Sequence, residues 1–337
     1  MTADGALTTY SGCRRSRAPS GPVRKASIMR HLLLAPLLLM TVAATGPGAA
    51  PFTVAEIGRG FARLQDAVDA ASARDGTVVV SPGTWRECAV QNAGTVTIRA
   101  ARAGTAVFDG TTCEGKAALV LRGRAAAVDG VVFRGLRVRD GNGAGIRLEK
   151  GDLHVANAMF LDSQEGILGG GDASEHVTID RSTFSGLGQC DESTDCAHSI
   201  YLGTIGDASV TRSRFERGHG GHYLKARAAR VSVADNSFDD TAGHKTNYMI
   251  DLSNGATGLI TRNTFVQGRD KENWSAFIVV AAEARSNPSA GLRVEGNTAT
   301  LAPGNTHTPA FVADLSHERL ALGANRLGAG LKPLELR

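Results

Sequence analysis

Short apolar segments that each end in phenylalanine recur along most of the chain. The recurring phenylalanines are Phe108, Phe133, Phe160, Phe184, Phe215, Phe238 and Phe265. A strand–helix–strand unit needs about 30 residues or more, whereas most of these intervals are 23 to 27 residues long. So short a repeat must return each strand parallel to its predecessor by turns alone. The pattern predicts an all-β solenoid of parallel coils, in which residues one repeat apart stack in columns.

A second column accompanies the phenylalanines. Small polar residues stand two positions before Phe in four repeats and continue beyond them: Ser182, Ser213, Asn236, Asn263, Asn297 and Asn325. We expect the phenylalanines to fill the interior and the asparagines to form a hydrogen-bonded ladder at a bend. Apolar residues at helical spacing over 61–71 predict an amphipathic helix that covers the open edge of the first coil.

The phrase Val80-Ser-Pro-Gly-Thr-Trp85 follows this helix. Here the sequence resembles the pectate-lyase-like superfamily of right-handed parallel β-helices, over roughly residues 52–337. The segments 198–201, 221–227 and 248–252 also resemble a group of uncharacterised secreted bacterial β-helix proteins. These resemblances imply a single β-helix domain over 51–337 with a capping helix, and they name no reaction.

The charge distribution separates residues 1–50 from the rest of the chain. The formal net charge is +4, but the first fifty residues hold six Lys and Arg against Asp4 alone. The remainder therefore carries −1, and basicity gives no argument for a nucleic-acid partner. A basic start at Met29, an apolar run over 32–44 and small residues up to Ala50 predict a signal peptide. We expect a secreted or periplasmic protein without a membrane span after cleavage.

Four cysteines remain after the leader and its Cys13. Cys88 and Cys113 are one repeat apart, so their side chains can stack at disulfide distance. Cys190 and Cys196 flank a short polar insert that a bridge would close into a small loop. An even number of cysteines in a secreted chain predicts two disulfides. Zinc is disfavoured because the cysteines lack the usual ligand spacing.

Register also predicts the candidate site. Where Ile or Leu points inward, the next residue points outward. The outward column then contains Arg147, Leu168, Tyr201, Lys225, Asp251 and Val279, and a second column contains Glu165, His198, His222 and Tyr248. Arg227 lies one pleat away from Lys225. Three adjacent coils thus gather polar and charged side chains, and the loop between Cys190 and Cys196 lies at the rim.

This cluster favours a polysaccharide lyase that cleaves a uronate-containing glycan by β-elimination. The reaction needs a base, a cation for the developing charge and an acid for the leaving oxygen. Lys225 or His222 is expected as the base, Arg227 as the carboxylate clamp, and Tyr201 or His198 as the acid. Asp251 completes the catalytic cluster. Further substrate contacts are expected from Tyr248, Arg147 and Glu165.

A similarity to alginate lyases and chondroitinase B implies a Lys and Arg pairing with calcium. The chain shows no dense carboxylate cluster, so we expect no metal or other cofactor, and calcium stays open as an alternative without support from the sequence. The partner is a polysaccharide, and the protein is expected to be a monomer.

Two other functions stay open. A glycoside hydrolase needs paired carboxylates, and Asp251 requires Glu165, Asp239 or Asp240 as its partner. A non-catalytic glycan-binding or surface protein would show aromatic platforms along the groove, and Trp274 lies beyond the cluster.

The cluster also has a purely structural interpretation, with Lys225 and Asp251 as a solvated ion pair of about 0.2–1 kcal/mol. Replacing Lys225 by Ala is expected to change the free energy of unfolding by less than about 0.5 kcal/mol, as surface changes do.

Overall fold

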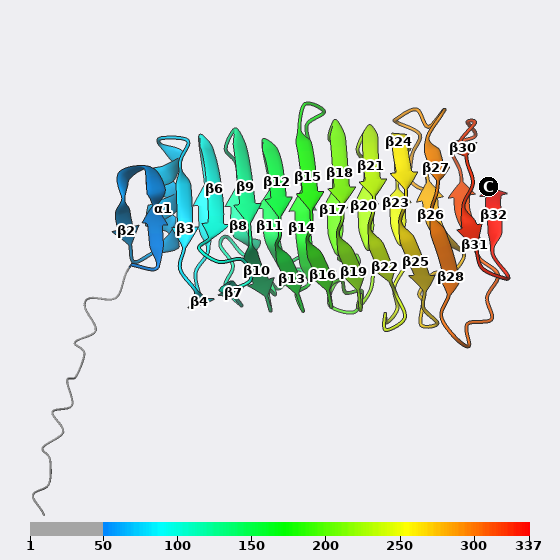
Figure 1. The fold of residues 1–337 in the computed structure, drawn as a ribbon, viewed down its shortest axis with the longest axis horizontal. Coiled ribbons are helices and arrows are strands. Elements are labelled where there is room, and N and C mark those ends of the chain that lie inside the picture. The colour runs from blue at the N-terminus through cyan, green and yellow to red at the C-terminus, as the bar shows by residue number, and fades with distance from the viewer. Residues whose placement is uncertain (1–49) are drawn as a thin grey trace, which may run out of the picture. The chain divides into compact units, whose positions relative to one another are not determined.

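A computed structural model describes residues 50–337, and the expected signal peptide and Cys13 lie outside this range. The described chain is a solenoid of parallel strands in three sheets, each running along its length (Figure 1). Each coil contributes one strand to sheet A, one to sheet B and one to sheet C in turn. The predicted all-β parallel solenoid is confirmed.

Sheet A has twelve strands, of which the first two pair antiparallel at the N-terminal end. Its strands are β1 (Phe52–Val54), β2 (Arg59–Phe61), β3 (Thr77–Val80), β6 (Thr95–Ala100), β9 (Ala125–Asp129), β12 (Asp152–Ala156), β15 (His176–Asp180), β18 (Asp207–Thr211), β21 (Arg230–Ala234), β24 (Thr257–Thr261), β27 (Arg293–Glu295) and β30 (Ala321–Leu322).

Sheets B and C have ten parallel strands each. Sheet B contains β4 (Gly83–Trp85), β7 (Ala106–Asp109), β10 (Val131–Arg134), β13 (Met159–Leu161), β16 (Thr183–Ser185), β19 (Arg214–Glu216), β22 (Ser237–Asp239), β25 (Thr264–Gln267), β28 (Thr298–Leu301) and β31 (Arg326–Leu327). Sheet C contains β5 (Ala89–Gln91), β8 (Ala117–Leu121), β11 (Ala144–Leu148), β14 (Glu165–Gly169), β17 (Ile200–Leu202), β20 (Leu224–Ala226), β23 (Ile250–Leu252), β26 (Ala276–Val280), β29 (Ala310–Asp314) and β32 (Lys332–Leu336).

The interior contains the predicted phenylalanine column. All seven phenylalanines lie on sheet B, are 0 % exposed and stack with ring centroids 4.6 to 5.8 Å apart. The polar column lies at the bend between sheets A and B. There the Asn236 side-chain amide donates to Asn263 Oδ1 at 2.9 Å, and Asn263 donates to Asn297 at 3.0 Å. Both predicted columns are confirmed.

Helix α1 (Leu64–Ser72) covers the N-terminal end, as predicted, after a short 3-10 turn η1 (Ala55–Ile57). Its buried face presents Leu64, Ala67, Val68 and Ala71 to the core. The helix begins three residues later than the sequence pattern indicates, because Phe61 ends β2.

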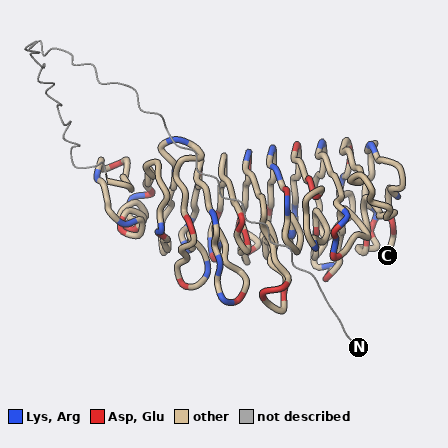
Figure 2. Tube along the Cα trace, turned by 90° about the horizontal axis from the view of Figure 1, so that it is seen from below, with Lys and Arg blue, Asp and Glu red and all other residues tan. Residues whose placement is uncertain are grey.

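Both predicted disulfides are present, with Cα atoms 5.5 Å apart for Cys88–Cys113 and 4.2 Å apart for Cys190–Cys196. No helix within 50–337 is both long enough and apolar enough to cross a membrane. Basic and acidic residues are interspersed along the solenoid (Figure 2), and neither sign forms a continuous stripe.

Candidate functional site

The predicted outward column runs along sheet C in the expected register. Tyr201 on β17 pairs with Lys225 on β20, which pairs with Asp251 on β23. The column continues to Leu168 and Arg147 on one side, and to Val279 on the other. The parallel strands thus place residues 24 and 26 positions apart on neighbouring coils.

A cavity of 580 Å³ opens over this column. Six of the predicted site residues line it: Arg147, His198, Tyr201, His222, Lys225 and Arg227. Asp195 and Cys196 also line it, so the disulfide-closed loop forms part of the rim, as expected. Asn142, Leu168, Gly221, Asn247, Glu272 and Glu283 complete the wall.

Lys225 and Asp251 are buried, which corrects the expectation of a solvated pair. Lys225 is 8 % exposed and Asp251 is 2 % exposed, with 3.5 Å between Nζ and Oδ2. Burial raises the pKa of Asp251 above its ordinary value, although Lys225 and a hydrogen bond from the Ser253 hydroxyl oppose the shift. Within the described residues, Asp251 Oδ1 has no hydrogen-bond partner. This interaction is a desolvated charge pair at the floor of the cavity.

Glu283 is a central member of the site that the sequence interpretation missed. Its Oε1 accepts a hydrogen bond from Lys225 Nζ, and its Oε2 lies 2.5 Å from Arg227 Nη2 and 3.1 Å from Arg227 Nε. Burial alone would raise the pKa of Glu283, but the hydrogen bonds from Lys225 and Arg227 hold it below its ordinary value. One carboxylate therefore bridges the two cations.

Glu283 lies outside every repeat. It belongs to the connection between β26 and β27, where its backbone N–H donates to the Ser253 carbonyl at 2.9 Å. Residues 281–292 form the longest connection from sheet C to sheet A in the described chain, and this length is the sequence signal that could have drawn attention to the segment.

Tyr201 lies beside both cations. Lys225 Nζ is 5.4 Å and Arg227 Cζ is 5.1 Å from the centroid of its ring, within cation–π range. Burial raises the pKa of Tyr201 above the ordinary 10.0, with the two cations opposing the shift. The phenol is therefore protonated at neutral pH and can donate a proton.

The rings of His198, His222 and Tyr248 stack along the second predicted column, with centroids 4.9 Å and 5.6 Å apart. Burial lowers the pKa of His198 well below 6.5 and that of His222 to about 3, and nearby cations reinforce both shifts. Both imidazoles are therefore neutral at pH 7. The backbone N–H of His222 donates to His198 Nδ1 at 2.9 Å, so the proton of His198 resides on Nε2.

His222 is turned toward the floor of the site. Its Nε2 lies 3.4 Å from Asp251 Oδ2, and its Nδ1 is buried without a hydrogen-bond partner in the described chain. His222 thus packs between the cavity and the buried carboxylate.

Other predicted residues lie outside the cavity wall. Glu165 is 1 % exposed and lies beneath the surface, and burial raises its pKa well above the ordinary value. Asp240 is enclosed by Lys271, Tyr223 and Thr246. Together with Asp239, these carboxylates were the expected hydrolase partners of Asp251, and none of them lines the cavity.

Within residues 50–337, no group of three or more His, Cys, Asp or Glu side chains is arranged to hold a metal ion. The potential ligands nearest the centre, Asp251 and Glu283, are both paired with Lys225.

No protein-family model matches the chain, and no curated protein matches it. Among solved structures, the chain is similar to the PL6 family alginate lyase AlyGC, with a TM-score of 0.45 and 14 % sequence identity. The match covers 79 % of this chain and 39 % of the alginate lyase, so this chain corresponds to well under half of that protein.

Proposed function

We propose that the protein is a secreted polysaccharide lyase that cleaves a uronate-containing glycan by β-elimination at the cavity on sheet C. The observation that carries this proposal is the carboxylate of Glu283 on Lys225 and Arg227. This contact supports the proposal because Lys225 and Arg227 are spaced to bind one carboxylate together. A uronate is the sugar unit that carries a carboxylate.

Arg227 supplies the main grip on the substrate. Its Nε and Nη2 both engage the carboxylate of Glu283, in the fork geometry that guanidinium offers to carboxylates. A substrate carboxylate that displaces Glu283 gains the same two hydrogen bonds. Bound there, it is partly neutralised, which makes the proton on the adjacent ring carbon easier to remove.

Lys225 is the base favoured by position. Its Nζ contacts Glu283, which lines the cavity, as well as Asp251. The Nε2 of His222 faces Asp251, and its Nδ1 is buried. Only the neutral amine can accept a proton, and the neutral amine no longer forms an ion pair with Glu283. Loss of the Lys225 proton and release of Glu283 therefore favour each other.

The proton balance follows from these positions. The Lys225 amine takes the proton from the carbon next to the carboxylate, and the resulting anion is held by Arg227. The electron pair then forms the carbon–carbon double bond as the glycosidic oxygen leaves. Tyr201 gives its phenolic proton to that oxygen, and the ammonium of Lys225 stabilises the tyrosinate until solvent restores the proton.

The test is incubation of the purified protein with alginate, polygalacturonate, chondroitin, hyaluronan and heparan, with absorbance followed near 235 nm. We expect unsaturated products from at least one glycan. Burial raises the pKa of Tyr201 above the ordinary 10.0, so the rate should fall where this phenol ionises, at a pH above 10.0. Absence of unsaturated products with every acidic glycan would refute the lyase assignment.

A glycoside hydrolase is the second candidate, because Asp251 and Glu283 both contact Lys225 and their pKa values shift in opposite directions. Asp251 is buried behind Lys225, which weakens this alternative. New reducing ends without absorbance near 235 nm would establish hydrolysis in place of elimination.

A further inference from the structure

Aromatic rings occupy five successive coils at the corner between sheets B and C. His198, His222 and Tyr248 precede β17, β20 and β23, and the series continues with Trp274 before β26 and His307 before β29. The first three rings stack on one another, and Trp274 stacks on His307 with ring centroids 4.4 Å apart and planes 8° apart. The row begins at the cavity and extends toward the C-terminal end.

Exposure increases along this row as far as Trp274. His198 and His222 are 7 % and 9 % exposed, Tyr248 is half-buried, and Trp274 is 41 % exposed. His307 supports one face of the Trp274 ring, so the exposed area belongs to the opposite face and the ring edge. In the described part of the chain, the other strongly exposed large apolar side chains are Ile57 at the N-terminal cap, and Leu334 and Leu336 on β32.

Trp274 is continuous with the cavity wall. Glu272, two residues earlier, lines the cavity, and its carboxylate accepts a hydrogen bond from the Asn247 side chain. Ser275, the next residue, lies 3.5 Å from the Tyr248 hydroxyl. The connection between β25 and β26, yellow to orange in Figure 1, therefore links the cavity to the exposed ring.

We propose that Trp274, supported by His307, is a distal subsite that binds the apolar face of a pyranose ring of the glycan. The positively polarised C–H groups on one face of a sugar ring pack against the electron-rich face of an indole. From β20, which carries Lys225, to β26 is two strand spacings, or about 10 Å. An extended glycan advances by about one strand spacing per sugar, so a chain bound along the axis reaches Trp274 a few sugars from Lys225.

This inference rests on the proposed glycan substrate and adds a direction to it. On the N-terminal side of His198, the corresponding connections from sheet B to sheet C, over 162–164 and 135–143, contain no aromatic residue. That side offers no ring, so the glycan extends from the cavity toward the C-terminal end.

The test is a binding measurement that does not depend on turnover. The chain contains two tryptophans, so in a Trp85→Phe background the remaining fluorescence reports on Trp274. Di- and hexasaccharides of alginate and of polygalacturonate, together with neutral xylohexaose, are titrated in the presence of acrylamide as quencher. We expect a hexasaccharide to protect Trp274, and a disaccharide held at the cavity to leave it exposed.

Variants then separate the subsite from the catalytic centre. By calorimetry, Trp274→Ala should bind the hexasaccharide about 3- to 10-fold more weakly and leave disaccharide binding unchanged. His307→Ala should have a smaller effect in the same direction. Ile57→Ala removes a side chain of matching exposure at the far end, and should change nothing. Circular dichroism verifies that each variant is folded.

The outcomes distinguish the two proposals. Unchanged hexasaccharide binding by Trp274→Ala would overturn the subsite even if unsaturated products are formed. Lack of protection of Trp274 by every oligosaccharide would also overturn it. If xylohexaose protects Trp274 from the quencher and no acidic glycan produces absorbance near 235 nm, the subsite at Trp274 is retained and the lyase proposal is refuted.

Discussion

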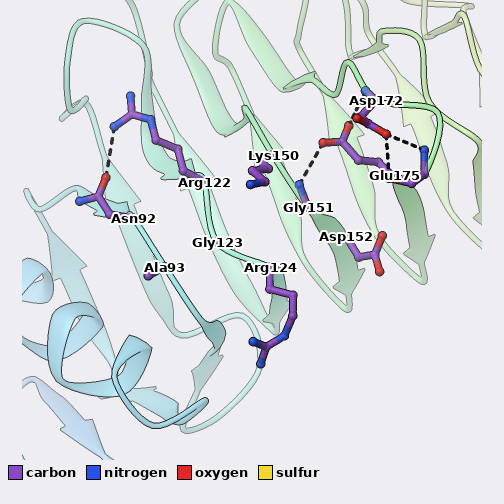
Figure 3. A pocket seen from close by; sticks show the side chains of 11 residues that line it. Asn92, Ala93, Arg122, Gly123, Arg124, Lys150, Gly151, Asp152, Asp172 and Glu175 are labelled. Atoms are coloured by element: carbon purple, nitrogen blue, oxygen red, sulfur yellow. Dashed lines mark hydrogen bonds between the residues drawn. The ribbon is translucent and has the colours of Figure 1, made fainter.

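Two polar hollows on the described part of the solenoid have similar sizes and differ in how their charges are held. The cavity on sheet C measures 580 Å³, and a hollow of 440 Å³ lies where the chain turns from sheet C to sheet A. In the first, Lys225 and Asp251 are nearly inaccessible to solvent. Figure 3 shows the residues that line the second hollow, Arg124 among them. The side chain of Arg124 is 67 % exposed, and that of its ion-pair partner Asp75 is 52 % exposed.

The carboxylates of the corner hollow stabilise turns. Glu175 accepts hydrogen bonds from the backbone N–H groups of Gly151, Gly171 and Asp172. Arg122 is held by Glu114 and Glu149 on the same outer edge. Every charged group there faces either solvent or a local partner. The corner hollow is therefore concave, but none of its charged groups is activated by its surroundings. Burial of opposed charges, rather than concavity, therefore distinguishes the candidate site.

The sharpest test of this contrast is to remove one cation from each hollow. Lys225→Ala should lower turnover by roughly 10²- to 10⁴-fold, because it removes the base. It should also lower the free energy of unfolding by about 1–3 kcal/mol, since Asp251 is left buried without its cation. Arg124→Ala, which breaks an exposed pair, should change the free energy of unfolding by less than about 0.5 kcal/mol and leave activity intact. Initial rates and urea unfolding measure these effects.

The stability value corrects the expectation from the sequence, which treated Lys225 as a surface residue. Wild-type turnover by a folded Lys225→Ala protein would remove Lys225 as the base. A loss of activity in Arg124→Ala would contradict the distinction between the two hollows.

A second difference is the dependence of stability on pH. In the unfolded chain His222 titrates near 6.5, whereas burial lowers its folded-state pKa to about 3. The unfolded state therefore binds the proton first, and stability is complete above pH 6.5 and falls as the pH decreases toward 3. The loss should be roughly 1.4 kcal/mol per pH unit for this histidine.

Urea unfolding between pH 6.5 and 4.5 measures that slope. His222→Gln should flatten it, and His176→Gln, which changes an exposed histidine on sheet A, should leave it as in the wild type. Equal slopes in wild type and His222→Gln would show that His222 is not held neutral by burial.

Arg227 and Arg122, one in each hollow, both bind carboxylates and offer a closer comparison. Arg227→Lys should lower kcat/KM by roughly 10- to 100-fold, because a single ammonium cannot reproduce the contacts of Nε and Nη2. Arg122→Lys changes a similar grip in the corner hollow and should leave kcat/KM unchanged. Full activity of Arg227→Lys would show that a bidentate grip on the substrate is unnecessary.

The sequence predicts the columns of this molecule better than the connections between them. Strand alternation and repeat length determine which residues share a face, so Tyr201, Lys225 and Asp251 could be aligned in advance. Alternation shows which side of a sheet a residue faces, but not what covers that side. The segment that carries Glu283 has no counterpart in the repeats, so neither Glu283 nor the burial of Lys225 followed from periodicity.

Glu283 allows the smallest and most discriminating test of the site. Glu283→Gln keeps the shape of the side chain and removes the charge that competes with a substrate carboxylate. We expect KM to fall by about 3- to 10-fold, since the loss of one partly exposed charged contact is worth about 1 kcal/mol.

Glu295→Gln is the matched control, because Glu295 pairs with Arg293 on β27, far from the cavity lining. Initial rates at a series of concentrations of the glycan identified near 235 nm provide KM. A higher KM for Glu283→Gln would mean that Glu283 organises Lys225 and Arg227 for substrate instead of occupying its place. The proposal that Arg227 and Lys225 bind a substrate carboxylate in place of Glu283 would then lose the observation that supports it.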